Sequence, residues 1–165
     1  MEIYFSKVRP VKSPSHGTDH SAGWDFFIPD YNKKFEDDFK EKNSVGHIED
    51  GKIVVPAWGD AIIPSGIKVN LPLGWHIVAM NKSGIATKQK LTVGACVVDT
   101  DYQGEIHLHL INTSNKPVRL DCGTKVIQFL PYYQPYLQML EKPIKELYNK
   151  ETSRGEGGFG STGIH

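Results

Sequence analysis

Cysteine is scarce in this chain of 165 residues: only Cys96 and Cys122 are present, and they lack the Cys-x-x-Cys spacing. Two cysteines are too few for a disulfide framework or for a structural zinc site built from thiolates. This scarcity favours a reducing compartment. We therefore expect a cytoplasmic protein, or one of the host-cell cytoplasm if the protein is viral.

Net charge and long apolar stretches are also missing. Lys and Arg total 19 and Asp and Glu total 19, so no basic field exists to hold a nucleic-acid polymer by counterion release. No apolar run approaches the roughly 18 residues that cross a bilayer, and the N-terminus lacks the basic and apolar regions of a signal peptide. We expect no nucleic-acid polymer and no membrane among the partners.

Short apolar or alternating runs, separated by Gly, Pro, Asn and Asp, fill most of the chain and predict many short strands. Such strands favour an all-β sandwich, jelly roll or barrel. The length suits one domain. The predicted strands are Ile3–Val8, Trp24–Ile28, Ile53–Val55, Ala61–Ile63, Ile67–Leu71, His76–Met80, Leu91–Val98, Glu105–Ile111, Val118–Leu120 and Lys125–Leu130.

Two segments depart from the strand pattern. Residues 30–51 are rich in charge, with Phe35 and Phe39 four apart, and we interpret them as a surface insertion with about one helical turn and no chemistry. Residues 151–165 are rich in glycine, which has much backbone entropy to lose on ordering. We therefore expect a β domain over residues 1–150 and a mobile C-terminal tail over residues 151–165.

The tail has a composition that suits phosphate binding. Glycine backbone N–H groups can converge on an anion, Ser161 and Thr162 add hydroxyl donors, and Arg154 offers a bidentate guanidinium. The aromatic face of Phe159 can cover a planar base. The glycine and lysine order of a P-loop is absent. The residues alone leave two interpretations open: a nucleotide-binding tail, or a glycine-rich terminus without function.

Three further segments carry candidate chemistry. The acidic stretch Asp99–Glu105 follows an apolar strand, and an Asp there can act as a general base toward water, although a simple hairpin turn explains the same residues. Ala22–Asp25 places one acid at the start of a strand, and Asn81–Gly84 sets a cation beside a hydroxyl. Either is also typical of an ordinary turn. Together they are the groups that a magnesium–phosphate site needs.

Five segments, in this order, resemble the motifs of the trimeric dUTP diphosphatases (dUTPases): Ala22–Asp25, Lys82–Gly84, Asp99–Glu105, Gly123–Gln128 and Arg154–Gly163. The tail is the longest and most specific match. The resemblance implies a jelly-roll-like β subunit, a homotrimer with active sites shared between subunits, and a Mg²⁺ cofactor. It implies hydrolysis of dUTP to dUMP and pyrophosphate, which limits dUTP and supplies dUMP for thymidylate synthesis.

The resemblance also implies a role for each matching residue. Asp99 would activate the attacking water, and Tyr102 would pack under the deoxyribose and exclude a 2′-hydroxyl. Asp25 and Gln128 would order water ligands of the magnesium ion. The expected substrate contacts are Lys82, Ser83, Gly84 and Val98 in the β domain and Arg154, Phe159, Gly160, Ser161 and Thr162 in the tail, with Phe159 stacked on uracil.

Two other functions stay open at this point. Deoxycytidine triphosphate deaminases have a similar fold, but they have a catalytic Glu at about the position of His109 and lack the glycine-rich tail. A β-sandwich that only binds other proteins has no need of Asp99, Tyr102 and Phe159. His107 and His109 alternate on one strand, but two histidines without a third ligand indicate ordinary surface or interface residues.

Overall fold

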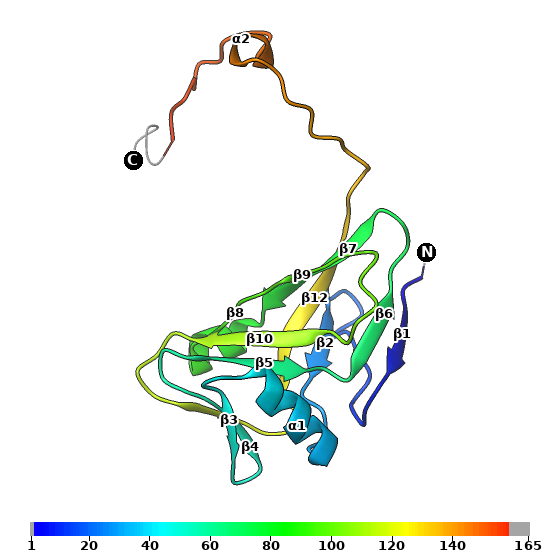
Figure 1. Ribbon diagram of the computed structural model, residues 1–165, viewed down its shortest axis with the longest axis vertical. Coiled ribbons are helices and arrows are strands. Elements are labelled where there is room, and N and C mark those ends of the chain that lie inside the picture. The colour runs from blue at the N-terminus through cyan, green and yellow to red at the C-terminus, as the bar shows by residue number, and fades with distance from the viewer. Residues whose placement is uncertain (1, 159–165) are drawn as a thin grey trace. The chain divides into compact units, whose positions relative to one another are not determined.

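The computed structural model describes residues 2–158, and most of its regular elements are short strands (Figure 1). The pairings among the named strands are antiparallel. The expectation of an all-β fold is confirmed.

The strands form four small sheets. One pairs β1 (Tyr4–Lys7) with β6 (Ile67–Asn70). A second has the order β5 (Asp60–Pro64), β10 (His107–Asn112), β8 (Leu91–Val93). A third has the order β11 (Val118–Leu120), β4 (Lys52–Val55), β3 (His47–Glu49). The fourth, which carries most of the candidate site, has the order β2 (Trp24–Phe27), β12 (Lys125–Tyr133), β7 (Trp75–Asn81), β9 (Val97–Val98).

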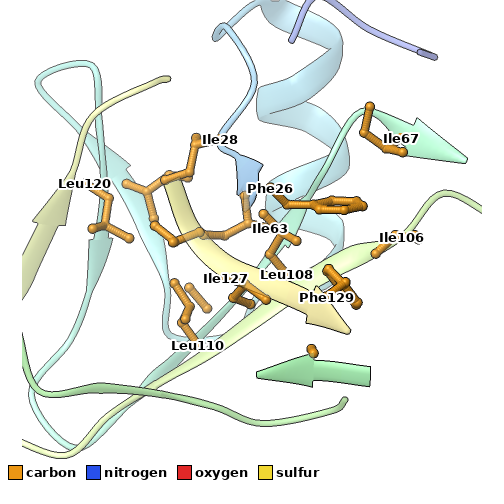
Figure 2. Close-up of a cluster of buried hydrophobic side chains, with 14 of the residues drawn as sticks. Phe26, Ile28, Ile63, Ile67, Ile106, Leu108, Leu110, Leu120, Ile127 and Phe129 are labelled. Carbon is orange, nitrogen blue, oxygen red and sulfur yellow. The ribbon is translucent and has the colours of Figure 1, made fainter. Parts of the chain in front are cut away.

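The core lies between these sheets, where apolar side chains from β2, β5, β10 and β12 converge (Figure 2). Along β10 the inward positions Leu108 and Leu110 are fully buried and alternate with half-buried histidines, as a strand with one core-facing side requires. The rings of Phe26 and Phe129 pack with centroids 4.5 Å apart. This cross-strand pair ties β2 to β12.

The segment expected to be a solvated insertion is instead part of the core. Residues Lys33–Lys42 form a ten-residue helix, α1, about three turns rather than one, and Phe35 and Phe39 on its inner face have no exposed surface. Asn32 caps the helix by accepting a hydrogen bond from the backbone N–H of Phe35 at 2.9 Å. The four-residue spacing of the two rings is therefore one face of a helix that packs beside β5 (Figure 1).

The single strand expected over Leu91–Val98 is two strands in different sheets. β8 pairs with β10, whereas β9 pairs with β7. The chain turns at Gly94, where a Cβ atom would lie 2.2 Å from Nδ1 of His109. Glycine is needed at this position because the backbone passes directly over the imidazole ring.

A second compact unit spans Tyr136–His165, after the first unit, Met1–Pro135. Its described part includes a short helix, α2 (Ile144–Leu147), and exposes large apolar side chains such as Leu137, Met139 and Ile144. The predicted boundary of the tail at residue 151 stays a prediction. Among residues 2–158, no helix is long and apolar enough to span a bilayer.

The burial of α1 predicts its contribution to stability. Replacing Phe39 by Ala should lower the free energy of unfolding by about 3–5 kcal/mol, because a fully buried aromatic leaves a cavity. Replacing the neighbouring exposed Lys40 by Ala should change it by less than about 0.5 kcal/mol. Urea unfolding of both variants measures the difference. Equal costs for the two would contradict the assignment of α1 to the core.

Candidate active site

Asp25 and Gln128, which were predicted to order water ligands of a magnesium ion, lie directly opposite each other on β2 and β12. Opposed residues of an antiparallel pair point to the same face of the sheet, so their side chains are neighbours. Gln128 donates a hydrogen bond from Nε2 to the carbonyl oxygen of Asn81 at 3.0 Å, at the end of β7. The next residue, Lys82, forms an ion pair with Oδ1 of Asp25. Three of the five predicted motifs thus meet at one end of the four-stranded sheet.

Asp25 is a buried carboxylate held between two cations. Its exposed fraction is 4%, and Lys125 contacts Oδ2 at 3.0 Å while Lys82 contacts Oδ1. Burial alone would raise the pKa of Asp25, but the hydrogen bonds and charges of the two lysines outweigh it and lower the pKa below the ordinary 3.8. Asp25 is therefore ionised at neutral pH and compensated on both oxygens.

Ser83 and Gly84 continue this cluster into a helical turn. They are exposed and lead from β7 into a short π-helical segment, Ile85–Gln89, which the sequence did not predict. The carbonyl of Ser83 accepts a hydrogen bond from the Thr87 hydroxyl at 2.7 Å. Ser83 and Gly84 are exposed to solvent directly after Lys82.

The second half of the predicted site is the acidic turn after β9. Its backbone is closed by a hydrogen bond from Tyr102 N–H to the Asp99 carbonyl at 3.2 Å, and the Thr100 hydroxyl donates to the carbonyl of Trp75 at the start of β7. Asp99 and Tyr102 are exposed. With Val98 they line a cavity of about 210 Å³, whose other walls are Ala95, Cys96, Val97, Ile106, His107 and Phe129. This cavity has an apolar floor and a carboxylate at its rim.

The two halves lie at opposite ends of β7. Val98 is opposite Ile77, near the start of this strand, whereas Lys82 follows its last residue. A strand rises about 3.3 Å per residue, so the two ends are about 20 Å apart. One chain therefore does not bring Asp99 within reach of a phosphate held by Lys82 and Ser83.

In the second unit, Arg154 is exposed and donates from Nε to the carbonyl of Gly157 at 2.9 Å. The other predicted tail contacts, Phe159, Gly160, Ser161 and Thr162, lie outside the described residues. Their roles stay predictions.

Among residues 2–158, no three His, Cys, Asp or Glu side chains gather closely enough to hold a metal ion. His109 instead contacts Oδ2 of Asp60 at 2.9 Å through Nε2 and accepts the N–H of Ala95 through Nδ1 at 2.9 Å. Burial lowers the pKa of His107 below 6.5. His107 lines the cavity, whereas His109 is held by Asp60 and Ala95.

The comparisons with known proteins agree with the resemblance to the dUTPases. The dUTPase family model matches residues 50–163. The chain belongs to the dUTPase family. A deoxyuridine 5′-triphosphate nucleotidohydrolase of Wolbachia pipientis is 36% identical over 116 residues, which are 69% of this chain and 74% of the relative. The enzyme of the same name from Paramecium bursaria Chlorella virus 1 is 30% identical over 161 residues, 95% of this chain and 94% of the relative.

Solved dUTPase structures share the fold. The dUTPase of Staphylococcus bacteriophage 80alpha, with bound dUpNHpp, matches with a TM-score of 0.75 at 17% identity and covers 99% of both chains. The native EIAV dUTPase matches with a TM-score of 0.63 at 19% identity, covering 88% of this chain and all of that one. The expectation of a dUTPase-like β fold is confirmed.

The sequence analysis missed Lys125 as the second partner of Asp25. Lys125 lies in the fourth motif, but its pairing depends on a register shift in β12 between Lys125 and Ile127. The available signal was a lysine in the same motif as Gln128, which was expected to act together with Asp25. The sequence does not give the direction of the Lys125 side chain, because a bulge changes which face of the sheet a residue occupies.

The double ion pair of Asp25 predicts a pH-dependent stability. Replacing Asp25 by Asn should destabilise the fold by about 3 kcal/mol at neutral pH, because the partly buried Lys82 loses its counter-charge, whereas the exposed Lys125 adds little to the cost. The pKa of Asp25 is lower in the folded state, so its contribution is fully present above the ordinary 3.8 and is lost as pH falls through the folded value. The cost of the substitution should therefore shrink in acid.

Chemical unfolding across pH measures this cost. Asp121→Asn, which breaks an exposed pair with Lys52, serves as the control and should cost less than about 1 kcal/mol at every pH. A cost for Asp25→Asn that stays constant down to about pH 3 would contradict the assigned ionisation.

Proposed function

We propose that the protein hydrolyses dUTP to dUMP and pyrophosphate. The observation that carries this proposal is the cavity lined by Asp99 and Tyr102. The chain also matches most of the length of relatives that are named deoxyuridine 5′-triphosphate nucleotidohydrolase. The cavity suits a nucleoside: Val98 and the apolar floor face the base, and Tyr102 lies beside the position of the sugar.

Asp99 is the general base of this reaction. It takes a proton from a water molecule, whose oxygen bonds to the α-phosphorus while the bond from that phosphorus to the bridging α,β-oxygen breaks. The electron pair of that bond leaves with pyrophosphate. Tyr102, packed under the sugar, leaves no space for a 2′-hydroxyl and so rejects UTP.

The phosphate chain binds at the other cluster. Lys82 supplies positive charge, Ser83 its hydroxyl and Gly84 its backbone. A magnesium ion fits here only through water and phosphate, because Asp25 is already paired with two lysines and no acidic triad lies among residues 2–158. Asp25 and Gln128 would hold water ligands of that ion, whose charge neutralises the triphosphate when bound.

The separation of the two clusters supports a shared active site. Groups that act on one triphosphate must lie within hydrogen-bond reach of it, directly or through one water molecule, whereas about 20 Å of β7 separates these groups in one chain. A homotrimer in which one copy supplies Asp99 and Tyr102 and another supplies Lys82 and Ser83 removes this conflict. In this arrangement the tail, with Arg154, Phe159, Gly160, Ser161 and Thr162, closes over the nucleotide.

The competing functions are less well supported. His109, at about the position of the deaminase glutamate, has both ring nitrogens engaged by Asp60 and Ala95. A pure binding module would not keep a carboxylate and a tyrosine at the rim of an apolar cavity. Pyrophosphate release from dUTP, with ammonia release from dCTP measured in parallel, separates all three functions.

Replacing Asp99 by Asn should lower kcat for dUTP by about 10²–10⁴-fold, because the amide accepts no proton from water. KM should change little, since the substitution keeps size and shape. Steady-state pyrophosphate release measures both constants. Wild-type kcat in this variant would contradict the role of Asp99.

Mixing variants tests the shared site. Asp99→Asn and Lys82→Ala should each be nearly inactive, but refolding them together should restore roughly a quarter of the sites, because neighbouring copies then supply the intact halves. Asp99→Asn mixed with Asp99→Ala is the matched control: both variants lack the same carboxylate, so no neighbouring copy supplies it and activity should not return. Equal recovery in both mixtures, or none in the first, would contradict a site divided between copies.

A further inference from the structure

Arg9 is almost completely buried, with 8% of its surface exposed, yet no motif includes it. It follows β1 and forms a bidentate pair with Glu105, from Nε to Oε1 at 2.8 Å and from Nη2 to Oε2 at 2.6 Å. Gly66, with φ +75°, leaves room for it, since a Cβ atom there would lie 2.7 Å from Cγ of Arg9. The backbone at Gly66 thus packs closely against the Arg9 side chain.

Glu105 is the last residue of the acidic motif and is fixed on two sides. Its Oε1 also accepts the N–H of Gly66 at 2.6 Å. Its carbonyl oxygen accepts the hydroxyl of Tyr102 at 2.8 Å, and the Tyr102 ring lies so close over Gly104 that a Cβ there would be 2.4 Å from the hydroxyl oxygen. The position of Tyr102 therefore depends on the position of Glu105.

Helix α1 also contacts the Arg9 guanidinium, through the same Nη2 atom that donates to Glu105. Asp38 accepts from Nη2 at 2.7 Å, and the guanidinium carbon lies 5.8 Å from the centroid of the Phe35 ring. The hydrogen bonds from Arg9 and Lys34 lower the pKa of Asp38, so this carboxylate is charged at neutral pH. A continuous set of contacts therefore joins α1 to the turn that carries Tyr102.

We propose that Arg9 is a positioning residue for sugar selection: it holds Glu105, and through it Tyr102, while Asp38 of α1 fixes the guanidinium. The proposal rests on the proposed function of Tyr102 in rejecting a 2′-hydroxyl. Such steric rejection depends on the placement of the ring, and misplacement of about 1 Å costs on the order of 10²-fold in enzymes. Helix α1, which lies outside the matched family segment, then contributes to specificity as well as to the core.

The test compares kcat/KM for dUTP and for UTP in four variants. Arg9→Gln should lower the dUTP/UTP ratio at least about tenfold, and Arg9→Lys should lower it less, because the ammonium keeps the charge without the two-pronged geometry. Asp38→Asn should lower it about two- to fivefold, since Arg9 keeps its pair with Glu105. Asp37→Asn is the matched control: it lies on the same helix in an exposed pair with Lys33 and should leave the ratio unchanged.

Hydrogen exchange of the Gly66 and Tyr102 amides in the nucleotide-free protein supplies a readout without catalysis. Exchange should accelerate in Arg9→Gln and Asp38→Asn and stay at the wild-type rate in Asp37→Asn. Variants that melt at a lower temperature but keep both the wild-type ratio and the wild-type exchange would overturn the proposal, because Arg9 would then be structural only. A wild type that leaves dUTP intact overturns the proposed function, whereas an active wild type with an unchanged ratio in Arg9→Gln overturns this inference alone.

Discussion

The extended geometry of β7 fixes the distance between the acidic turn and Lys82. This strand is fixed along its length by β12 on one edge, while β9 pairs with its first half on the other. A paired strand cannot shorten, so the acidic turn at one end and Lys82 at the other stay about 20 Å apart. The subunit therefore presents two separate clusters of candidate site residues; under the proposed function, the acidic turn is the nucleoside half-site and the cluster at Lys82 is the phosphate half-site.

Each half-site is built by a different physical means. The phosphate half relies on charge: Asp25 is buried between two lysines and so stays ionised without carrying a net negative field. The nucleoside half relies on shape, with an apolar cavity whose rim is set by hydrogen bonds of the turn to Trp75 and Glu105. This division agrees with the substrate, which joins a planar, weakly polar base to a highly charged triphosphate.

Alternation and turn residues were enough to predict the fold class and most strands, including β11 and β12, because the core-facing period survives in the sequence. The same signals failed where tertiary contacts decide. Phe35 and Phe39 gave the helical spacing but not the length of α1, and the break between β8 and β9 follows from His109 packing on Gly94. Residue chemistry marked the candidate segments of the site, and the resemblance assigned their roles. That Asp25 meets Gln128 depends on register, and Arg9 meets Glu105 across 96 positions of sequence. No local pattern encodes either contact.

The central claim is that one nucleotide is handled by two copies of the chain. The most direct test is a crystal structure of the assembled protein with a non-hydrolysable dUTP analogue and Mg²⁺. The account predicts that the Asp99 beside the α-phosphorus and the Ser83 that contacts the phosphate chain belong to different copies. A nucleotide contacted by Asp99 and Ser83 of one and the same copy would contradict it.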